Sequence, residues 1–252
     1  RCGYYPAGTA TNRQNADNPA VKIPAEYSYS VKGGRQELGL PMVATAESGA
    51  NRMQFYHITA AINVMLQNSE SFDLDIDSIV VNSDSYGLNH TTGFGITISR
   101  NDPPVVGKSN PSQGAGWRRV RLNFPDPLEV KAGSSDSVVQ IPIRPIGTDN
   151  LTIKVYCKGN GKRYIYSHSN TLSNELKRNE VLTAKVDLRL VTHNNGHMEE
   201  VEESHRLVDM STQTYPFTAQ DGDTLYGGTM PGNYTSKQCI IPEGATVTLR
   251  NL

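Results

Sequence analysis

Hydrophobic and polar residues alternate with a period of two along most of this chain. The clearest run is 58–66, where Ile58, Ala60, Ile62, Val64 and Leu66 fall on one face. Similar runs occur at 27–31, 94–98, 120–124, 151–155 and 182–190. This period predicts β-strands with one face on a core and the other on solvent. Turn formers separate the runs, so the pattern predicts an all-β chain with antiparallel sheets that form a sandwich or a barrel.

The alternation also predicts which side chains are buried. The inward set comprises Ile62, Val64, Ile153, Val155, Val186 and Leu188, and the outward set comprises Asn63, Lys154, Lys185 and Asp187. The run Val139–Ile143 contains Pro142, and Pro145 follows it. Because proline has no N–H to give to a neighbouring strand, we expect this strand at a sheet edge.

The composition of the chain changes after Val191, where the sequence becomes polar and acidic. We expect an N-terminal sandwich, whole or incomplete, at 1–71, a C-terminal sandwich at 72–193, and a linker plus β-rich extension at 194–252. The polar segment His193–Glu203 (HNNGHMEEVEE) is expected to form the linker or a hairpin loop, and one or two helical turns are expected near Ser173–Arg178. The chain stops just after a strand-like run, which is typical of an excerpt from a longer protein.

Charge and composition exclude some classes of function. The chain has 24 Lys+Arg against 25 Asp+Glu, a net charge of -1, which gives no electrostatic signature for nucleic acid. No apolar run approaches the roughly 20 residues that span a bilayer, so we expect no transmembrane segment. Three cysteines lie far apart, and Cys157 continues an apolar alternation, which predicts a buried and inert thiol.

Two groups of residues have the chemistry of metal ligands but not the required pattern. One group, Asp73, Asp75, Asp77 and Asp84, takes positions 1, 3, 5 and 12 of a calcium loop, but Ser78 replaces the turn glycine and Ile79–Val81 is apolar. The other group, His193, His197 and His205 with Glu199, Glu200, Glu202 and Glu203, has no standard zinc spacing. The sequence therefore predicts no metal site.

Motifs for catalysis are also missing from the sequence. It has no GxSxG, no phosphate-binding loop and no dinucleotide-binding glycine pattern. We therefore predict no catalytic residues and no cofactor, and a protein that is not an enzyme. The candidate binding residues are Tyr226 and Tyr234, which could stack on the sugar rings of a glycan.

Two parts of the chain resemble the fimbrillin family, the fimbrial subunits and surface adhesins of Bacteroidales bacteria. The first is the ordered set Leu38–Ala44 (LGLPMVA), His57–Leu66 (HITAAINVML) and Phe72–Asn82 (FDLDIDSIVVN). The second is Leu172–Leu190 (LSNELKRNEVLTAKVDLRL). The resemblance implies tandem antiparallel β-sandwiches, Greek-key and transthyretin-like, in a secreted, outer-membrane-associated protein of the cell surface. It also implies a fimbrial (pilus) subunit, tip or anchor that works in adhesion and exchanges strands with other subunits or with copies of itself.

The C-terminal part of the chain is similar to a different class of protein. The segments Asp221–Gly227, Gly232–Tyr234 and Ile241–Leu249 resemble the opening rung of secreted β-solenoid carbohydrate-binding modules, in which short strands stack and glycines turn the corners. This resemblance implies carbohydrate binding. The alternative to a fimbrial subunit is therefore a monomeric, surface glycan-binding adhesin.

If the fimbrial hypothesis holds, an extended segment from another subunit adds to an open sheet edge. We expect the receiving groove around Tyr27–Val31 and Ile58–Leu66, where a reduced N-terminal domain would lack a strand. The donor would be residues 1–24 or the chain after His193.

Overall fold

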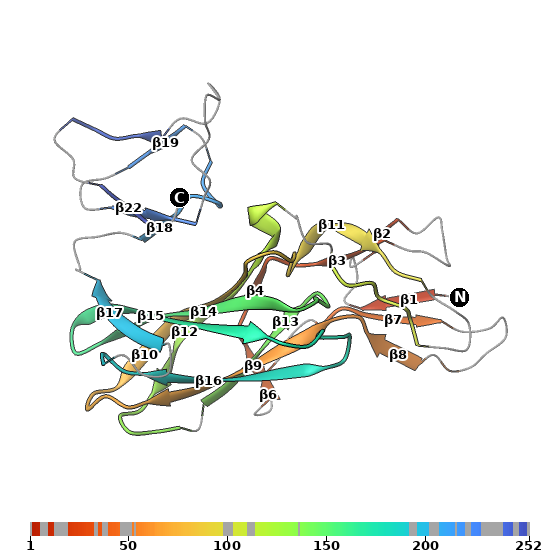
Figure 1. Cartoon of the computed structure of the whole chain (residues 1–252), viewed down its shortest axis with the longest axis horizontal. Helices are drawn as coiled ribbons and strands as arrows, with labels where there is room; N and C mark the ends of the chain where they lie inside the picture. Colours follow the sequence, from red (N-terminus) through yellow and green to blue (C-terminus); the bar gives the residue numbers. More distant parts are fainter. Residues whose placement is uncertain are drawn as a thin grey trace. The chain divides into compact units, whose positions relative to one another are not determined.

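The computed structural model of this chain describes sixteen stretches of the sequence. They are residues 2–5, 10–12, 20–32, 35–36, 40–45, 52, 54–97, 103–109, 114–135, 137–191, 196–201, 207–214, 216–219, 223–227, 239–243 and 247–250. The chain is all-β with several sheets (Figure 1), as the alternation predicted. In the described stretches the only helical element is the 3-10 turn Ala115–Trp117. Among them, no helix is long and apolar enough to cross a membrane.

The chain divides into two compact units, Arg1–Asn160 with Tyr164–Glu199, and Gly161–Arg163 with Glu200–Leu252. In the larger unit, a six-stranded and a three-stranded sheet share one hydrophobic core. The six-stranded sheet has the order β17 (Gly196–Val201), β15 (Lys162–Leu172), β14 (Asp149–Gly159), β10 (Leu74–Ser83), β12 (Arg119–Val130) and β4 (Glu26–Ser28). The facing sheet has the order β13 (Ser137–Ile143), β9 (Ala60–Asn68) and β16 (Val181–Leu188).

A second, smaller core in the same unit joins two three-stranded sheets. One sheet has the order β11 (His90–Gly95), β3 (Ala20–Ile23) and β2 (Ala10–Asn12), and the other has the order β1 (Cys2–Tyr5), β7 (Met42–Thr45) and β8 (Gln54–His57). A hairpin of β5 (Val31–Lys32) and β6 (Arg35–Gln36) completes the unit. The three-part division predicted from the sequence stays a prediction, and a domain ending at residue 71 would share β9 with the core of the strands that follow.

Burial confirms the predicted inward set. All six inward side chains are at most 4% exposed, whereas Lys185 is exposed and Asn63, Lys154 and Asp187 are half-buried. The strand at Val139–Ile143 is also where it was expected. It belongs to β13, which lies at an edge of its sheet.

Three expectations about local structure are wrong. The segment around Ser173–Arg178 forms no helix, because Leu176 pairs with Ile146 through two backbone hydrogen bonds of 3.1 and 2.9 Å. Part of the expected linker is the strand β17, where Met198 and Val201 are buried. The run 27–31 is split between β4 and β5, and Val31 is 53% exposed.

The smaller unit contains two parallel β-sheets, and its chain alternates between them. One contains β18 (Leu207–Asp209), β20 (Thr224–Tyr226) and β22 (Thr248–Arg250), and the other contains β19 (Phe217–Thr218) and β21 (Cys239–Ile240). Strands that follow one another in the chain lie in alternate sheets, which is the winding of a β-solenoid. Val208, Met210, Ala219 and Leu225 form a small core between them.

Candidate functional site: an open strand edge

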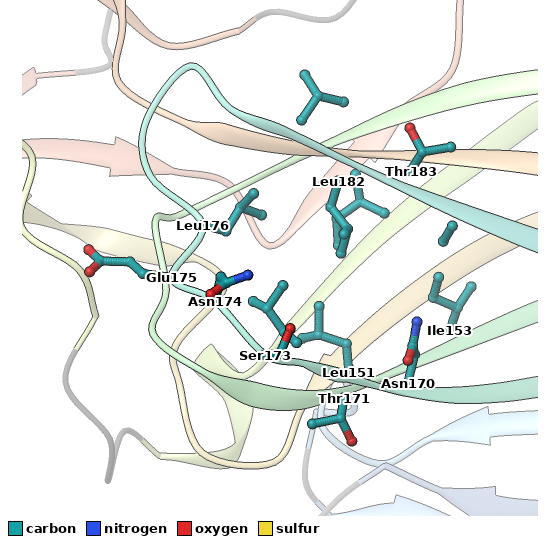
Figure 2. Close-up of a pocket in the computed structure, with 14 residues that line it drawn as sticks. Leu151, Ile153, Asn170, Thr171, Ser173, Asn174, Glu175, Leu176, Leu182 and Thr183 are labelled. Atoms are coloured by element: carbon teal, nitrogen blue, oxygen red, sulfur yellow. The ribbon is translucent and has the colours of Figure 1, made fainter.

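A groove lies at one side of the larger sandwich, where the chain crosses from β15 to β16. Its volume is about 270 Å³. It is lined by residues of β14, β15 and β16, by the loop between β15 and β16, and by Ile62 of β9, as the close-up in Figure 2 shows. The lining is largely apolar at its floor, with Leu151, Ile153 and Leu182. We call this feature, with the adjoining edge of β16, the β16 groove.

The outer edge of β16 has no neighbouring strand among the described residues. β16 runs parallel to the central strand β9, and their register pairs Val181 with Ala61. The N–H of Ala61 donates to the carbonyl of Glu180 at 3.0 Å, and the N–H of Ser69 donates to the carbonyl of Leu188 at 3.1 Å. The backbone groups of even-numbered residues therefore point toward β9. Because these groups alternate along a strand, those of the odd-numbered residues point outward.

The core beneath the first half of β16 is incompletely covered. Leu182 and Ala184 face inward but are only half-buried, whereas Val186 and Leu188, further along the same face, are at most 1% exposed. Val181, on the opposite face, is 49% exposed. The apolar floor of the groove therefore lies beside unpaired backbone donors and acceptors, which is what an added strand would cover.

The other edge of the same sheet is closed. The side-chain amide of Gln36 donates to the carbonyl of Gln140 at 3.0 Å and accepts the N–H of Gln140 at 2.9 Å. Pro142 lies two residues further along β13, so its missing N–H falls on the same outward edge. These two features block strand addition at β13. The contrast makes β16 the open edge of this sheet.

The receiving groove was predicted around Tyr27–Val31 and Ile58–Leu66. Tyr27 lies in β4, at an edge of the six-stranded sheet, but the prediction for Ile58–Leu66 is wrong. β9 is the central strand of its sheet, with antiparallel β13 on one edge and parallel β16 on the other. The chain itself therefore occupies both edges of β9. The open edge belongs instead to β16, one strand further out. Its sequence signal was present, since Leu182–Leu190 alternates, but alternation does not identify which edge of a strand is paired.

The two predicted glycan-stacking residues are not brought together by the described part of the chain. Tyr226 is half-buried in β20, and its carbonyl accepts the N–H of Met210 at 2.8 Å. Tyr234 lies outside the described residues. Glycan binding through this pair stays a prediction.

The aspartates of the calcium-like pattern have separate partners. Asp73 accepts a hydrogen bond from the N–H of Ala132 at 2.8 Å, and that bond, with the hydrogen bond from Lys131, lowers its pKa. Asp84 accepts a hydrogen bond from the side chain of Asn150 at 3.1 Å. The inward residues Leu74 and Ile76 are fully buried.

The histidine-rich segment is only partly described. His197 contacts Glu199 at 2.8 Å, whereas His193 and His205 lie outside the described residues. Within the described part of the chain, no group of three potential ligands is close enough to hold a metal ion.

We expect metals to leave the stability of this protein unchanged. Thermal unfolding with calcium, with zinc or with a chelator should agree within about 2 °C, because a ligand that binds only the folded state is needed to raise stability. A rise of about 10 °C with one metal would contradict this expectation.

Cys157 is the buried thiol that the alternation predicted. It is 2% exposed, and burial together with the charge of Asp77 raises its pKa to about 12. A thiol with so high a pKa is almost entirely protonated at neutral pH and is a poor nucleophile.

Comparison with solved structures gives a structural likeness. No protein-family model matches the chain, and neither does any curated protein. The chain is similar to the crystal structure of a "putative cell adhesion protein" from Bacteroides ovatus ATCC 8483, with a TM-score of 0.38 and 13% sequence identity. The alignment covers 80% of this chain and 65% of that one, so this chain spans less than two thirds of the Bacteroides protein. The function is therefore argued from the β16 groove.

Proposed function

We propose that this protein is a non-enzymatic adhesion protein of the cell surface, a fimbrial (pilus) subunit, tip or anchor. In this proposal the β16 groove accepts an extended strand from another subunit or from a second copy. The observation that carries the proposal is the open edge of β16 above a partly uncovered core. The resemblance of 38–82 and 172–190 to fimbrillins agrees with this function and with an extracellular, outer-membrane-associated location.

The chemistry of the edge suits strand addition. Val181, Thr183 and Lys185 present backbone N–H and carbonyl groups outward, and each hydrogen bond to an added strand contributes about 1 kcal/mol. Side chains of the added strand would alternate, and those facing inward would cover Leu182 and Ala184. An open edge of this kind otherwise invites aggregation.

A proline at position 183 tests this role. Thr183→Pro removes an outward N–H and leaves the hydrogen bonds between β16 and β9 in place. Thr183→Val is the matched control, since it keeps the N–H and a β-branched side chain. Peptides covering Arg1–Pro24 and Ser204–Leu252 serve as donors, because the sequence analysis places the donor strand in these regions. We expect one peptide to bind the wild type and the valine variant, and to bind the proline variant at least tenfold more weakly.

The outcome against the proposal is equally specific. Binding measured by sedimentation would be unchanged by Thr183→Pro, or neither peptide would bind and the wild type would stay monomeric at all concentrations. The glycan-binding adhesin would then replace the fimbrial subunit as the better hypothesis. Tyr226 and Tyr234 would be the first residues to substitute in that case.

A further inference from the structure

A buried arginine without an acidic partner among the described residues directly follows β13, two residues before Ile146. Arg144 is only 9% exposed, and its backbone N–H donates to the carbonyl of Leu88 at 2.8 Å. Its guanidinium carbon lies 4.3 Å from the centroid of the Phe94 ring. The Nε atom is fully enclosed and has no hydrogen-bond partner in the structure. The position of the side chain is therefore fixed by packing against an aromatic ring.

Among the described residues, no carboxylate forms an ion pair with Arg144. Burial lowers the pKa of Arg144 below its usual value. A buried cation is costly unless an anion or several hydrogen-bond acceptors accompany it. The guanidinium of Arg144 is therefore a buried positive charge without a carboxylate partner among the described residues, and an external anion would compensate it.

Two further aromatic rings lie beyond the Phe94 ring that packs on Arg144. The ring of His90 lies 5.7 Å from that of Phe94 and 4.4 Å from that of Trp117. Burial, and after it the charge of Arg144, lowers the pKa of His90, which favours the neutral imidazole. The carbonyl of Trp117 accepts the N–H groups of Leu88 and Asn89 at 2.7 and 3.1 Å, so the 3-10 turn holds this half-buried ring in place.

We propose that Arg144, His90 and Trp117 form a binding site for an acidic sugar with a single carboxylate, of the uronic or sialic acid type. A guanidinium binds a carboxylate through two parallel hydrogen bonds, and Arg144 supplies one charge for one carboxylate. The half-buried Trp117 ring, to which the His90 ring is tilted by 45°, offers an apolar face of the kind that packs against the C–H face of a sugar ring. A flexible acidic side chain of a peptide would use the charge but not this surface. This site is independent of strand addition at β16.

The chain carries its own reporter for this site. Trp117 is its one tryptophan, so intrinsic tryptophan fluorescence reports on the site alone. The probes are glucuronate and N-acetylneuraminate, with glucose as the neutral control and acetate, phosphate and a glutamate-rich peptide as the other anions. We expect a saturable fluorescence change with one of the two acidic sugars, and none with glucose.

Three variants separate charge from structure. Arg144→Met keeps much of the packing but loses the charge, and we expect at least a tenfold loss of affinity with no fall in melting temperature. Arg144→Lys keeps the positive charge but loses the planar guanidinium, which can donate two parallel hydrogen bonds to a carboxylate. We again expect a loss of affinity. Arg163→Met removes an exposed arginine elsewhere and should bind as the wild type does. If Arg144→Met does not fold, the lysine variant carries the test.

Several outcomes would overturn the proposal. One is a response to glucose equal to that of the acidic sugars, and another is acidic-sugar binding unchanged in the Arg144 variants. A response to acetate or phosphate equal to that of the sugars would show an anion site without sugar recognition. Tighter binding of the glutamate-rich peptide would assign the site to a protein partner. No response to either acidic sugar would also reject it.

Discussion

Val186→Asp is expected to destabilise the larger sandwich by about 4 kcal/mol, a large share of the 5–15 kcal/mol that folded domains have. Val186 is 1% exposed in the main core, so the substitution removes apolar burial and places a carboxyl among hydrocarbon. Chemical denaturation would measure the loss. Far-UV circular dichroism at low temperature would confirm that the variant folds.

The neighbouring residue is the matched control. Lys185 is exposed on the opposite face of β16, so Lys185→Asp should change stability by no more than about 0.5 kcal/mol. Equal effects at the two positions would mean that β16 is out of register by one residue, which would exchange its two faces.

Asn68→Asp is the second large effect, and we expect a loss of about 3 kcal/mol. Asn68 is fully buried, and its amide nitrogen donates to the carbonyls of Phe72 at 2.8 Å and Val130 at 3.0 Å. Its side-chain oxygen accepts the N–H of Glu70 at 3.0 Å. A carboxylate keeps the acceptor but turns an oxygen lone pair toward two carbonyl oxygens.

Equilibrium unfolding in urea at neutral pH measures this loss. Gln67→Glu makes the same chemical change at the adjacent exposed position and should be nearly silent. The deficit of Asn68→Asp should shrink on acidification, because a protonated carboxyl regains one donor. A deficit below about 1 kcal/mol would show that the three hydrogen bonds do not fix the end of β9.

Alternation predicted those strands whose faces do not change along their length. β9, β14 and β16 alternate along most of their length, so most of their buried residues could be identified directly from the sequence. Ala61 and Tyr156, which lie off the predicted inward face, are buried as well. β10 could not be read so simply. Leu74 and Ile76 face the core, and so do Ile79 and Val81, because a register shift between Ile76 and Ser78 moves the pattern by one residue.

The errors come from pairings between distant segments. Residues 173–178 have helix-forming composition, but six residues are too few for a stable helix, and Leu176 pairs with Ile146 instead. The strand β17 was not predicted, because glutamates stand next to Met198 and Val201 in the sequence. Both of these residues are buried. The sequence did not single out Arg144. Whether an arginine has a carboxylate partner depends on which residues the fold brings close to it.

The location of the open edge was also beyond the sequence. The pattern at Ile58–Leu66 predicted β9 correctly, but not that a parallel β16 would cover it from 120 residues away in the chain. Parallel pairing leaves no local signature such as a hairpin turn. Two features close the opposite edge, Pro142 and the side chain of Gln36. The hydrogen bonds of Gln36 also depend on a pairing between distant segments. Only Pro142 could be read from the sequence.

The measurement that tests strand addition most directly is amide hydrogen exchange along β16, resolved by residue. In the isolated subunit, Leu182, Ala184 and Val186 should be protected by their bonds to β9, while Val181, Thr183 and Lys185 should exchange rapidly. When the subunit binds the donor peptide or another copy, these three amides should become protected. Protection of Thr183 and Lys185 in the isolated monomer, or rapid exchange of both in the bound form, would contradict strand addition at β16.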